Sequence, residues 1–353
     1  MINLTKGRSG FDRLTFQRQL TIFFLITAVL AMLFVSVIAY FQATTELEKN
    51  FTLYTASILN RTKDEIVTKF NMVENTLNFI AADYRLQMLG APASPVDQRS
   101  LAKLLVDSIN LNNYQVSLDN RRITKNLIDD LLIYSDYAEK PMVVIGRRDH
   151  FTAYGIEQYL TPELLATARA AEGGVVWSEI FFNPVGARLM VNLPPELLRE
   201  ELNQIAVIKW LFDVQTKRSI GYLVASINLS RLSGLIEDIV LGKTGRLYLV
   251  DQKMQVLAGS EKNLILRPIP LDEESRAQLA ASPAGSIKGK FNHQHSFIHY
   301  QEIATNNWKL VGVISSQEFE AAAGEVRNLI LIGGILVLAV FAAVAVVAAG
   351  KIT

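Results

Sequence analysis

Residues Leu20–Phe41 read LTIFFLITAVLAMLFVSVIAYF and residues Leu329–Gly350 read LILIGGILVLAVFAAVAVVAAG, and neither stretch contains a charged residue. A helix of about 20 residues spans the roughly 30 Å hydrocarbon core of a bilayer, so each stretch is long enough to cross it. The first stretch is longer than the core of a signal peptide and has no small-x-small cleavage site at its end. The sequence therefore predicts two membrane spans that bracket a polar-patterned segment, residues 42–328.

Basic residues are distributed unequally around the first span. Four of them precede it, whereas two acidic residues are the first charges after it: Lys6, Arg8, Arg13 and Arg18 before, Glu46 and Glu48 after. Lysine and arginine favour the cytoplasmic side of a membrane. We therefore expect a cell-membrane protein with both termini in the cytoplasm and residues 42–328 outside.

The composition excludes several classes of function. The chain of 353 residues contains no cysteine, which excludes disulfides, thiolate metal sites and a cysteine nucleophile. A net charge of +1 gives no electrostatic reason to expect a nucleic-acid partner. No G-x-S-x-G or H-E-x-x-H motif occurs, and Gly242-Lys-Thr244 lacks the upstream glycine of a phosphate-binding loop. The sequence predicts no catalytic residue and no cofactor.

Three histidines raise the question of a metal site. Alternation along a strand would place His293, His295 and His299 on one face, where neutral imidazoles bind Zn²⁺. A closed zinc site needs a fourth ligand, and polar residues with a period of two on a solvated sheet face explain the same pattern. We therefore predict no metal site.

Residues 42–89 contain neither proline nor glycine. Their apolar residues recur at steps of three and four, except for one gap of eight that spans Thr62, which predicts one amphipathic helix continuous with the first span. The Gly90–Pro95 cluster ends this helix, and a shorter one is expected at Val96–Asn110. The apolar residues are Leu47, Phe51, Tyr54, Ile58, Ile66, Phe70, Val73, Leu77, Ile80 and Tyr84.

Two successive groups of strand-like runs follow, each with a helical segment between its strands. Short antiparallel strands with a helix across one face indicate an α+β fold. The first group has strands at 130–135, 142–146, 175–182, 189–193, 204–212 and 220–227, with a helix at 155–171. The second has strands at 245–251, 255–258, 286–291, 296–302 and 308–314, with a helix at 272–281. The expected domains are 1–19 (cytoplasmic), 20–41 (first span), 42–110 (long stalk helix and second helix), 111–228 (distal unit), 229–241 (helical connector), 242–328 (proximal unit), 329–350 (second span) and 351–353 (start of the cytoplasmic output).

This organisation, together with four local stretches, resembles the double Cache sensor domain of bacterial transmembrane receptors. The stretches are VVWSEIFFNPVGARLMVNLPP (Val175–Pro195), IGYLVASINLSRLSGLI (Ile220–Ile236), GKTGRLYLVDQKMQVLAGS (Gly242–Ser260) and NNWKLVGVIS (Asn306–Ser315). The resemblance implies two tandem PAS-like antiparallel-sheet subdomains behind the long helix.

The resemblance also implies a ligand site in the distal unit, between the curved sheet and the loops over it. By that analogy the ligand-binding candidates are Tyr134, Arg148, Trp177, Phe182, Asn183 and Asp213. Core packing explains Trp177 and Phe182 equally well, and a surface position explains Tyr134 and Arg148. Amino-acid-binding members carry an Arg-x-Trp-Tyr run, and the corresponding Arg147–Phe151 here lacks the Trp-Tyr pair. The ligand is therefore expected to be another small extracellular molecule, or a solute-binding protein that delivers the signal.

Within the family, the chain looks most like the sensor histidine kinases of Gram-positive bacteria, truncated where a HAMP helix begins. The kinase part would lie beyond Thr353, so this chain is not itself expected to be an enzyme. The implied partners are the lipid bilayer, a second copy of the chain, and a cytoplasmic response regulator reached through the output domain. The alternatives are a methyl-accepting chemotaxis receptor, a transmembrane transcription regulator, and a surface enzyme held by two anchors.

Overall fold

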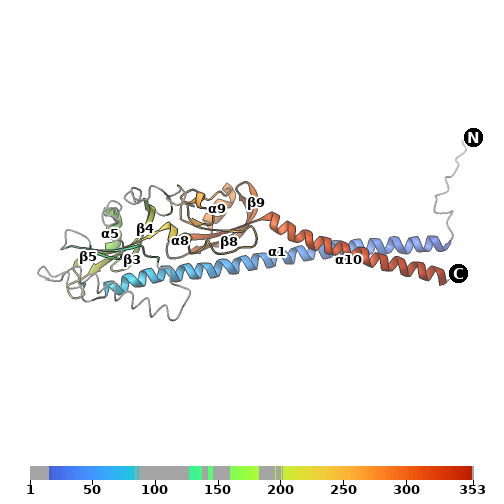
Figure 1. Ribbon diagram of the computed structural model, residues 1–353, viewed down its shortest axis with the longest axis horizontal. Coiled ribbons are helices and arrows are strands. Elements are labelled where there is room, and N and C mark those ends of the chain that lie inside the picture. The colour runs from blue at the N-terminus through green and yellow to red at the C-terminus, as the bar shows by residue number, and fades with distance from the viewer. Residues whose placement is uncertain are drawn as a thin grey trace, which may run out of the picture. The chain divides into compact units, whose positions relative to one another are not determined.

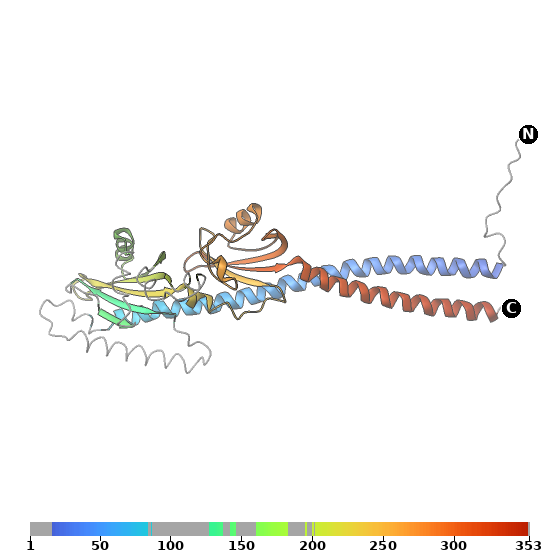
Figure 2. The same ribbon diagram turned by 45° about the horizontal axis from the view of Figure 1, so that its top comes forward.

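The computed structural model describes residues 16–83, 86, 127–136, 142–145, 160–182, 195, 200 and 202–351. The chain divides into two compact units. We call Met1–Tyr54 together with Ser315–Thr353 the helical unit, and Thr55–Ile314 the sheet unit. Helix α1 (Phe16–Ala81) contributes to both units (Figures 1 and 2).

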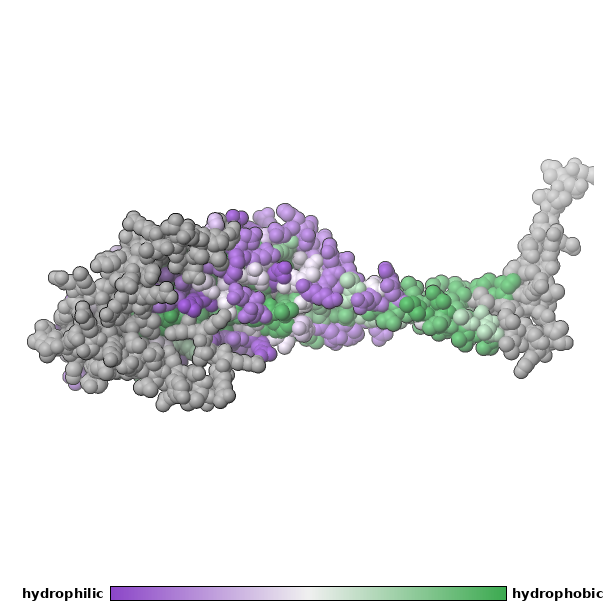
Figure 3. Space-filling model, in the orientation of Figure 1, coloured by the Kyte–Doolittle hydropathy of each residue, from purple (hydrophilic) through white to green (hydrophobic). Residues whose placement is uncertain are grey.

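The helical unit consists of the first part of α1 and of α10 (Ser316–Lys351). Both helices contain windows apolar enough to cross a membrane, with mean hydropathies of 2.1 and 2.3, and almost nothing in these windows is buried. Figure 3 shows their apolar side chains on the molecular surface. A Cβ atom at Gly334 of α10 would lie 2.3 Å from Cε of Met32, so the two helices approach closely at this glycine.

The second part of α1 is the core helix of the sheet unit. Its predicted apolar face is confirmed from Ile66 to Ile80, because Ile66, Phe70, Val73, Leu77 and Ile80 are all buried. The predicted gap of eight residues was wrong. Leu59 rather than Ile58 is buried, and Thr62 lies 3% exposed between Leu59 and Ile66, so steps of three and four continue without a break. The helix ends at Ala81, before the predicted Leu89.

The distal sheet is antiparallel, with strand order β2-β1-β5-β4-β3. Helix α5 covers one of its faces and α1 the other (Figures 1 and 2). The predicted strand at 189–193, the helix at 96–110 and the first residues of the helix at 155–171 lie outside the described residues. The elements are β1 (Asp130–Ser135), β2 (Met142–Ile145), α5 (Pro162–Ala170), β3 (Val175–Phe182), β4 (Asn203–Phe212) and β5 (Ser219–Asn228).

The proximal sheet repeats this topology, with order β7-β6-β10-β9-β8 and helix α9 on the face away from α1 (Figures 1 and 2). Two sheets of the same strand order therefore follow one another, as an α+β double-sheet fold requires. The connector is helical only at α8 (Leu229–Ser233) and continues as turns, so the prediction of one helix to Val240 was wrong. The elements are β6 (Arg246–Val250), β7 (Val256–Gly259), η2 (Lys262–Leu264), α9 (Glu273–Ala281), β8 (Ala284–Phe291), β9 (Gln294–Ile303) and β10 (Trp308–Ser315).

The three histidines do not share a strand face. His293 has a φ of 66° in the turn before β9, whereas His295 and His299 lie on that strand. His299 is only 2% exposed, and within the described part of the chain its Nε2 has no hydrogen-bond partner. Burial lowers the pKa of His299 because a charged imidazole would lose its hydration there.

This depressed pKa predicts a loss of stability in acid. The unfolded chain protonates His299 near pH 6.5, whereas the folded chain holds it neutral to lower pH, so the unfolded state binds more protons. As the pH falls below about 6.5, the free energy of unfolding should drop by up to about 1.4 kcal/mol per pH unit. Thermal unfolding of the wild type and of His299→Leu between pH 5 and 7.5 measures this. On acidification the melting temperature of the wild type should fall more than that of the variant. A difference between the two melting temperatures that stays constant with pH would contradict the prediction.

Candidate ligand-binding site

The face of the distal sheet beneath α5 is ordered in rows that run across strands β1, β5 and β4. Residues that pair across antiparallel strands point to the same face, so the strand register fixes which side chains are neighbours. A polar row lies at one end, an aliphatic row follows, and an aromatic row closes the other end. The rows are Asp130–Ser226–Ala206, Leu132–Val224–Ile208 and Tyr134–Tyr222–Trp210, with the pair Gln204–Asn228 beyond the first.

The aromatic row is a continuous stack. The rings of Tyr134 and Tyr222 lie 4.8 Å apart at 12°, and those of Tyr222 and Trp210 lie 5.1 Å apart at 27°. Arg169 of α5 places its guanidinium carbon 5.7 Å from the Trp210 ring centroid. The indole N–H of Trp210 donates to Ser219 Oγ at 2.9 Å, which fixes the ring in the plane of the stack. These three rings are partly exposed, so they form an aromatic wall rather than a closed core.

The polar row is buried deeply. Asp130 is 6% exposed and accepts a hydrogen bond from the fully buried Ser226 hydroxyl at 3.1 Å. Gln204 is 5% exposed, and among the described residues its Oε1 has no hydrogen-bond partner. A buried polar atom without a partner costs free energy, so a hydrogen-bond donor arriving at this end of the face would be bound favourably. The polar row and the adjacent Gln204 therefore offer acceptor oxygens of two kinds, a carboxylate and an amide.

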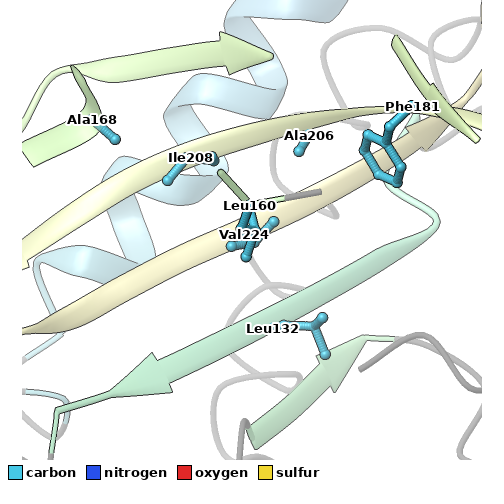
Figure 4. Packing of buried hydrophobic residues seen from close by; sticks show 7 residues of the cluster. All are labelled: Leu132, Leu160, Ala168, Phe181, Ala206, Ile208 and Val224. Atoms are coloured by element: carbon cyan, nitrogen blue, oxygen red, sulfur yellow. The ribbon is translucent and has the colours of Figure 1, made fainter. Parts of the chain in front are cut away.

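The aliphatic row joins the two ends and packs under α5. Leu132, Val224 and Ile208 form one buried cluster with Ala168 of α5 and with Phe181 of β3 (Figure 4). Helix α5 begins with Thr161 as its N-cap, whose hydroxyl accepts from the amide of Leu164, and Pro162 follows at the first helical position. This short helix contacts mainly β3 and β4, and its Arg169 lies over Trp210 of the aromatic row.

The sequence-predicted site residues are not gathered in one place. Tyr134 lies on the α5 face, in the aromatic row. Trp177 lies on the opposite face, where its indole N–H donates to Glu74 of α1 at 2.8 Å. Phe182, at the end of β3, is 45% exposed and pairs with Asn203 rather than with a member of the rows. Arg148 and Asn183 lie outside the described residues.

Asp213 organises the turn between β4 and β5. It accepts hydrogen bonds from the amides of Gln215 and Thr216 and from the Thr216 hydroxyl. The backbone hydrogen bond from Thr216, and next the one from its hydroxyl, hold the pKa of Asp213 below its ordinary value. Its role within the turn accounts for its contacts. Whether any of the six predicted residues contacts a ligand stays a prediction.

Sequence reasoning missed five residues of this face: Asp130, Gln204, Trp210, Tyr222 and Ser226. All of them lie within runs that the sequence identified as strands, and they alternate with buried apolar residues. That alternation was a usable signal. The alternation does not tell which of the two alternating sets of strand residues faces α5 and which faces α1, because both faces of this sheet are covered.

A partly buried cluster of charged residues links this subdomain to the proximal one. Glu200, just before β4, is 1% exposed and accepts hydrogen bonds from the Ser233 hydroxyl of α8 at 2.5 Å and from Lys262 of η2 at 2.9 Å. Lys262 also donates to Glu237 at 3.1 Å. Burial alone would lower the pKa of Lys262, but its hydrogen bonds to the two carboxylates raise it above the ordinary value. The lysine is therefore held charged between the subdomains.

Among the described residues, no group of three or more His, Cys, Asp or Glu is placed to hold a metal ion.

The family model described as "Cache domain" (dCache_1) matches residues 42–323, which is most of the chain. The chain belongs to the dCache_1 family of Cache domains. This confirms the predicted resemblance and the α+β fold class, and it makes the sheet-containing part of this dCache chain a ligand-binding sensor domain.

Solved structures share the dCache fold at low sequence identity. The sensory domain of the Campylobacter jejuni chemoreceptor Tlp3 is 13% identical, with a TM-score of 0.51 over 78% of this chain and 98% of that one. The ligand-binding domain of the Pseudomonas fluorescens chemoreceptor CtaA, solved with L-isoleucine, is 12% identical, with a TM-score of 0.51 over 80% of this chain and 99% of that one. No curated protein matches the chain. At this identity the likeness shows the fold alone.

Proposed function

We propose that this dCache chain is the extracytoplasmic ligand-sensing and transmembrane-signalling half of a bacterial two-component sensor histidine kinase. The observation that carries the sensing part is the α5 face of the distal sheet, where an aromatic wall and a buried polar row stand at opposite ends of an aliphatic floor. Binding sites for small molecules combine such an apolar surface with a few well-placed polar groups.

The chemistry of this face suggests the class of ligand. Stacked rings of Tyr134, Tyr222 and Trp210 favour a planar or apolar body. The carboxylate of Asp130 and the amide oxygen of Gln204 favour a hydrogen-bond-donating end, such as an amine or a hydroxyl. We propose a small organic molecule with these two features, taken up directly or delivered by a solute-binding protein.

Signalling requires the ligand to bind two conformations of the receptor unequally. The contacts inside the sheet unit supply candidate elements. Trp177 of the distal sheet and Trp308 of the proximal sheet both pack on Phe70 of α1, and Glu200 contacts α8 and η2. A displacement of the distal sheet would therefore displace α1 and β10 through these contacts. Strand β10 continues directly into α10.

The proposed topology has both termini in the cytoplasm, residues 42–328 outside, and a homodimer as the signalling unit. The chemistry of the cytoplasmic output domain distinguishes a sensor histidine kinase from a chemotaxis receptor. A histidine kinase would transfer phosphate from ATP to its own histidine and then to a response regulator, whereas a chemotaxis receptor would act through an adaptor and a separate kinase. Reconstitution of the full-length protein in vesicles with labelled ATP separates them, because only the kinase labels itself.

Ligand binding at the α5 face is tested by a screen with variants. We expect one compound class to raise the melting temperature of the chain in detergent micelles and to be recovered chemically unchanged. Asp130→Asn and Tyr222→Leu should each weaken that compound's affinity about tenfold or more, because each removes an interaction in a largely desolvated site. Calorimetric titration measures the dissociation constant.

The matched control is Asp213→Asn, which alters a carboxylate of the same subdomain in the β4–β5 turn, off the proposed face. Its affinity should equal that of the wild type. If Asp213→Asn loses affinity while Asp130→Asn keeps it, the site lies elsewhere. Conversion of the compound into a product would instead support the membrane-anchored enzyme.

A further inference from the structure

A cavity of about 610 Å³ lies between α1 and α10 within the helical unit. Glu48 of α1 and Glu320, Gly324 and Arg327 of α10 are among the residues that line it, with Tyr40 at one end. Gly324 faces open space, because a Cβ atom added there would meet no atom within 4 Å. We call this cavity the interhelical hollow.

The hollow lies at the outer boundary of the apolar segments. Phe41 ends the first apolar run, and Arg327 stands two residues before Leu329, which begins the second. Glu48 stands seven residues beyond Phe41, and Glu320 stands seven residues before Arg327, which is about 10 Å along a helix that rises 1.5 Å per residue. The hollow therefore presents a cation at the edge of the hydrocarbon region and carboxylates farther out.

The charges on α10 do not neutralise each other. Glu320 and Arg327 lie two turns apart, and neither makes an ion pair with any residue that the structure describes. Arg327 is exposed, and arginine is the side chain best suited to bidentate contact with a phosphate. Exposed apolar side chains continue the surface toward the span, among them Phe41 at 66% and Leu329 at 70%.

We propose that the interhelical hollow binds a phospholipid of the extracytoplasmic leaflet whose headgroup carries a primary amine, as in phosphatidylethanolamine. Arg327 contacts the phosphate, the carboxylates of Glu48 and Glu320 accept hydrogen bonds from the ammonium group, and the acyl chains lie along the apolar part of the helices. The order of charges matches the lipid, since its phosphate lies closer to the acyl chains than its amine. The inference rests on the membrane topology proposed above and is independent of the ligand at the α5 face.

The charge pattern also selects among headgroups. A primary ammonium donates three hydrogen bonds, which two carboxylates can accept. A choline group carries the same charge but donates none, and a glycerol headgroup has no positive charge to meet Glu48 and Glu320. The hollow should therefore prefer ethanolamine over choline and glycerol headgroups, and the preference should come from the carboxylates rather than from Arg327.

Lipid retention by the full chain tests this inference. The chain is reconstituted in nanodiscs that contain equal amounts of phosphatidylethanolamine, phosphatidylcholine and phosphatidylglycerol, and native mass spectrometry identifies the lipid that stays bound after release. The wild type should retain an ethanolamine lipid preferentially. Gly324→Leu, which fills the hollow without changing charge, and Arg327→Gln should each reduce retention about tenfold, as expected when one strong interaction is removed. Glu48→Gln with Glu320→Gln should abolish the preference for ethanolamine over choline.

Gly333→Leu is the matched control, because a Cβ atom at Gly333 also meets no atom within 4 Å but this residue does not line the hollow. It should retain lipid as the wild type does. Equal retention by Gly324→Leu, or equal retention of all three headgroups by the wild type, overturns the inference. A wild type that retains no lipid while Gly324→Leu shifts the dimer fraction also overturns it, and assigns the hollow to a second copy of the chain. A chain that fails to insert overturns the topology as well, whereas loss of the lipid alone leaves the sensing proposal intact.

Discussion

A Gly221→Ala variant is expected to lose about 3 kcal/mol or more of folding free energy, enough to unfold the distal subdomain in part of the population. Gly221 has a φ of 138°, which side-chain-bearing residues rarely adopt. A Cβ atom there would lie 1.9 Å from the carbonyl oxygen of Tyr134 and 2.9 Å from Cα of Ser135. Both of these are backbone atoms of the neighbouring strand β1, so no side-chain rotation can relieve the clash.

The effect should reach the candidate site, because Gly221 pairs with Ser135 beside the Tyr134–Tyr222 stack. Gly173→Ala is the matched control. Its φ of 89° is also positive, but the nearest atom to an added Cβ is Nζ of Lys209 at 4.0 Å. We expect it to cost only about 1 kcal/mol. Melting temperatures of both variants in detergent micelles decide the matter, and equal losses would show that φ rather than the strand contact sets the cost.

The second large effect is expected at Phe70, on the other side of the distal sheet. Its ring is fully buried, 4.8 Å from Trp177 of the distal sheet and 5.6 Å from Trp308 of the proximal sheet. Phe70→Ala would leave a cavity where α1 meets both sheets, at a cost of about 3–5 kcal/mol. Because both indoles face this cavity, the tryptophan emission should also shift to longer wavelength as water approaches them.

Phe79→Ala is the control on the same helix, since Phe79 is 43% exposed. It should change the melting temperature little and leave the emission unchanged. Chemical or thermal unfolding followed by fluorescence reports both quantities. A Phe70→Ala variant as stable as Phe79→Ala would mean that the cavity collapses and that α1 does not hold the two sheets together.

The linear pattern of the chain was sufficient for much of the fold. Strand β1 was predicted with its observed bounds, and the predicted apolar face of α1 is confirmed from Ile66 to Ile80. The predicted apolar face of α1 was wrong at Leu59 and Thr62, because the threonine was interpreted as a break in the apolar pattern. Buried beside the sheet, Thr62 occupies the position that the period demands.

The candidate site was harder to predict, because it depends on which strands are neighbours. Tyr134 and Trp177 both looked like pocket residues in the sequence. The pairing of β1 with β5 places Tyr134 on the face beneath α5. The pairing of β3 with β4 places Trp177 on the opposite face, against α1. Likewise Asp130 and Ser226 are far apart in the chain and meet only because their strands pair.

The sequence by itself determined the two long apolar segments, the long amphipathic helix and the two strand groups, because length, hydropathy and local period are properties of consecutive residues. Only the tertiary structure decided which face of the distal sheet carries the stacked rings and buried acceptors, and which residues of α1 and α10 enclose the interhelical hollow. Strand register and helix approach join residues that are distant in the chain, and a sheet covered on both faces gives its two sides the same pattern of burial.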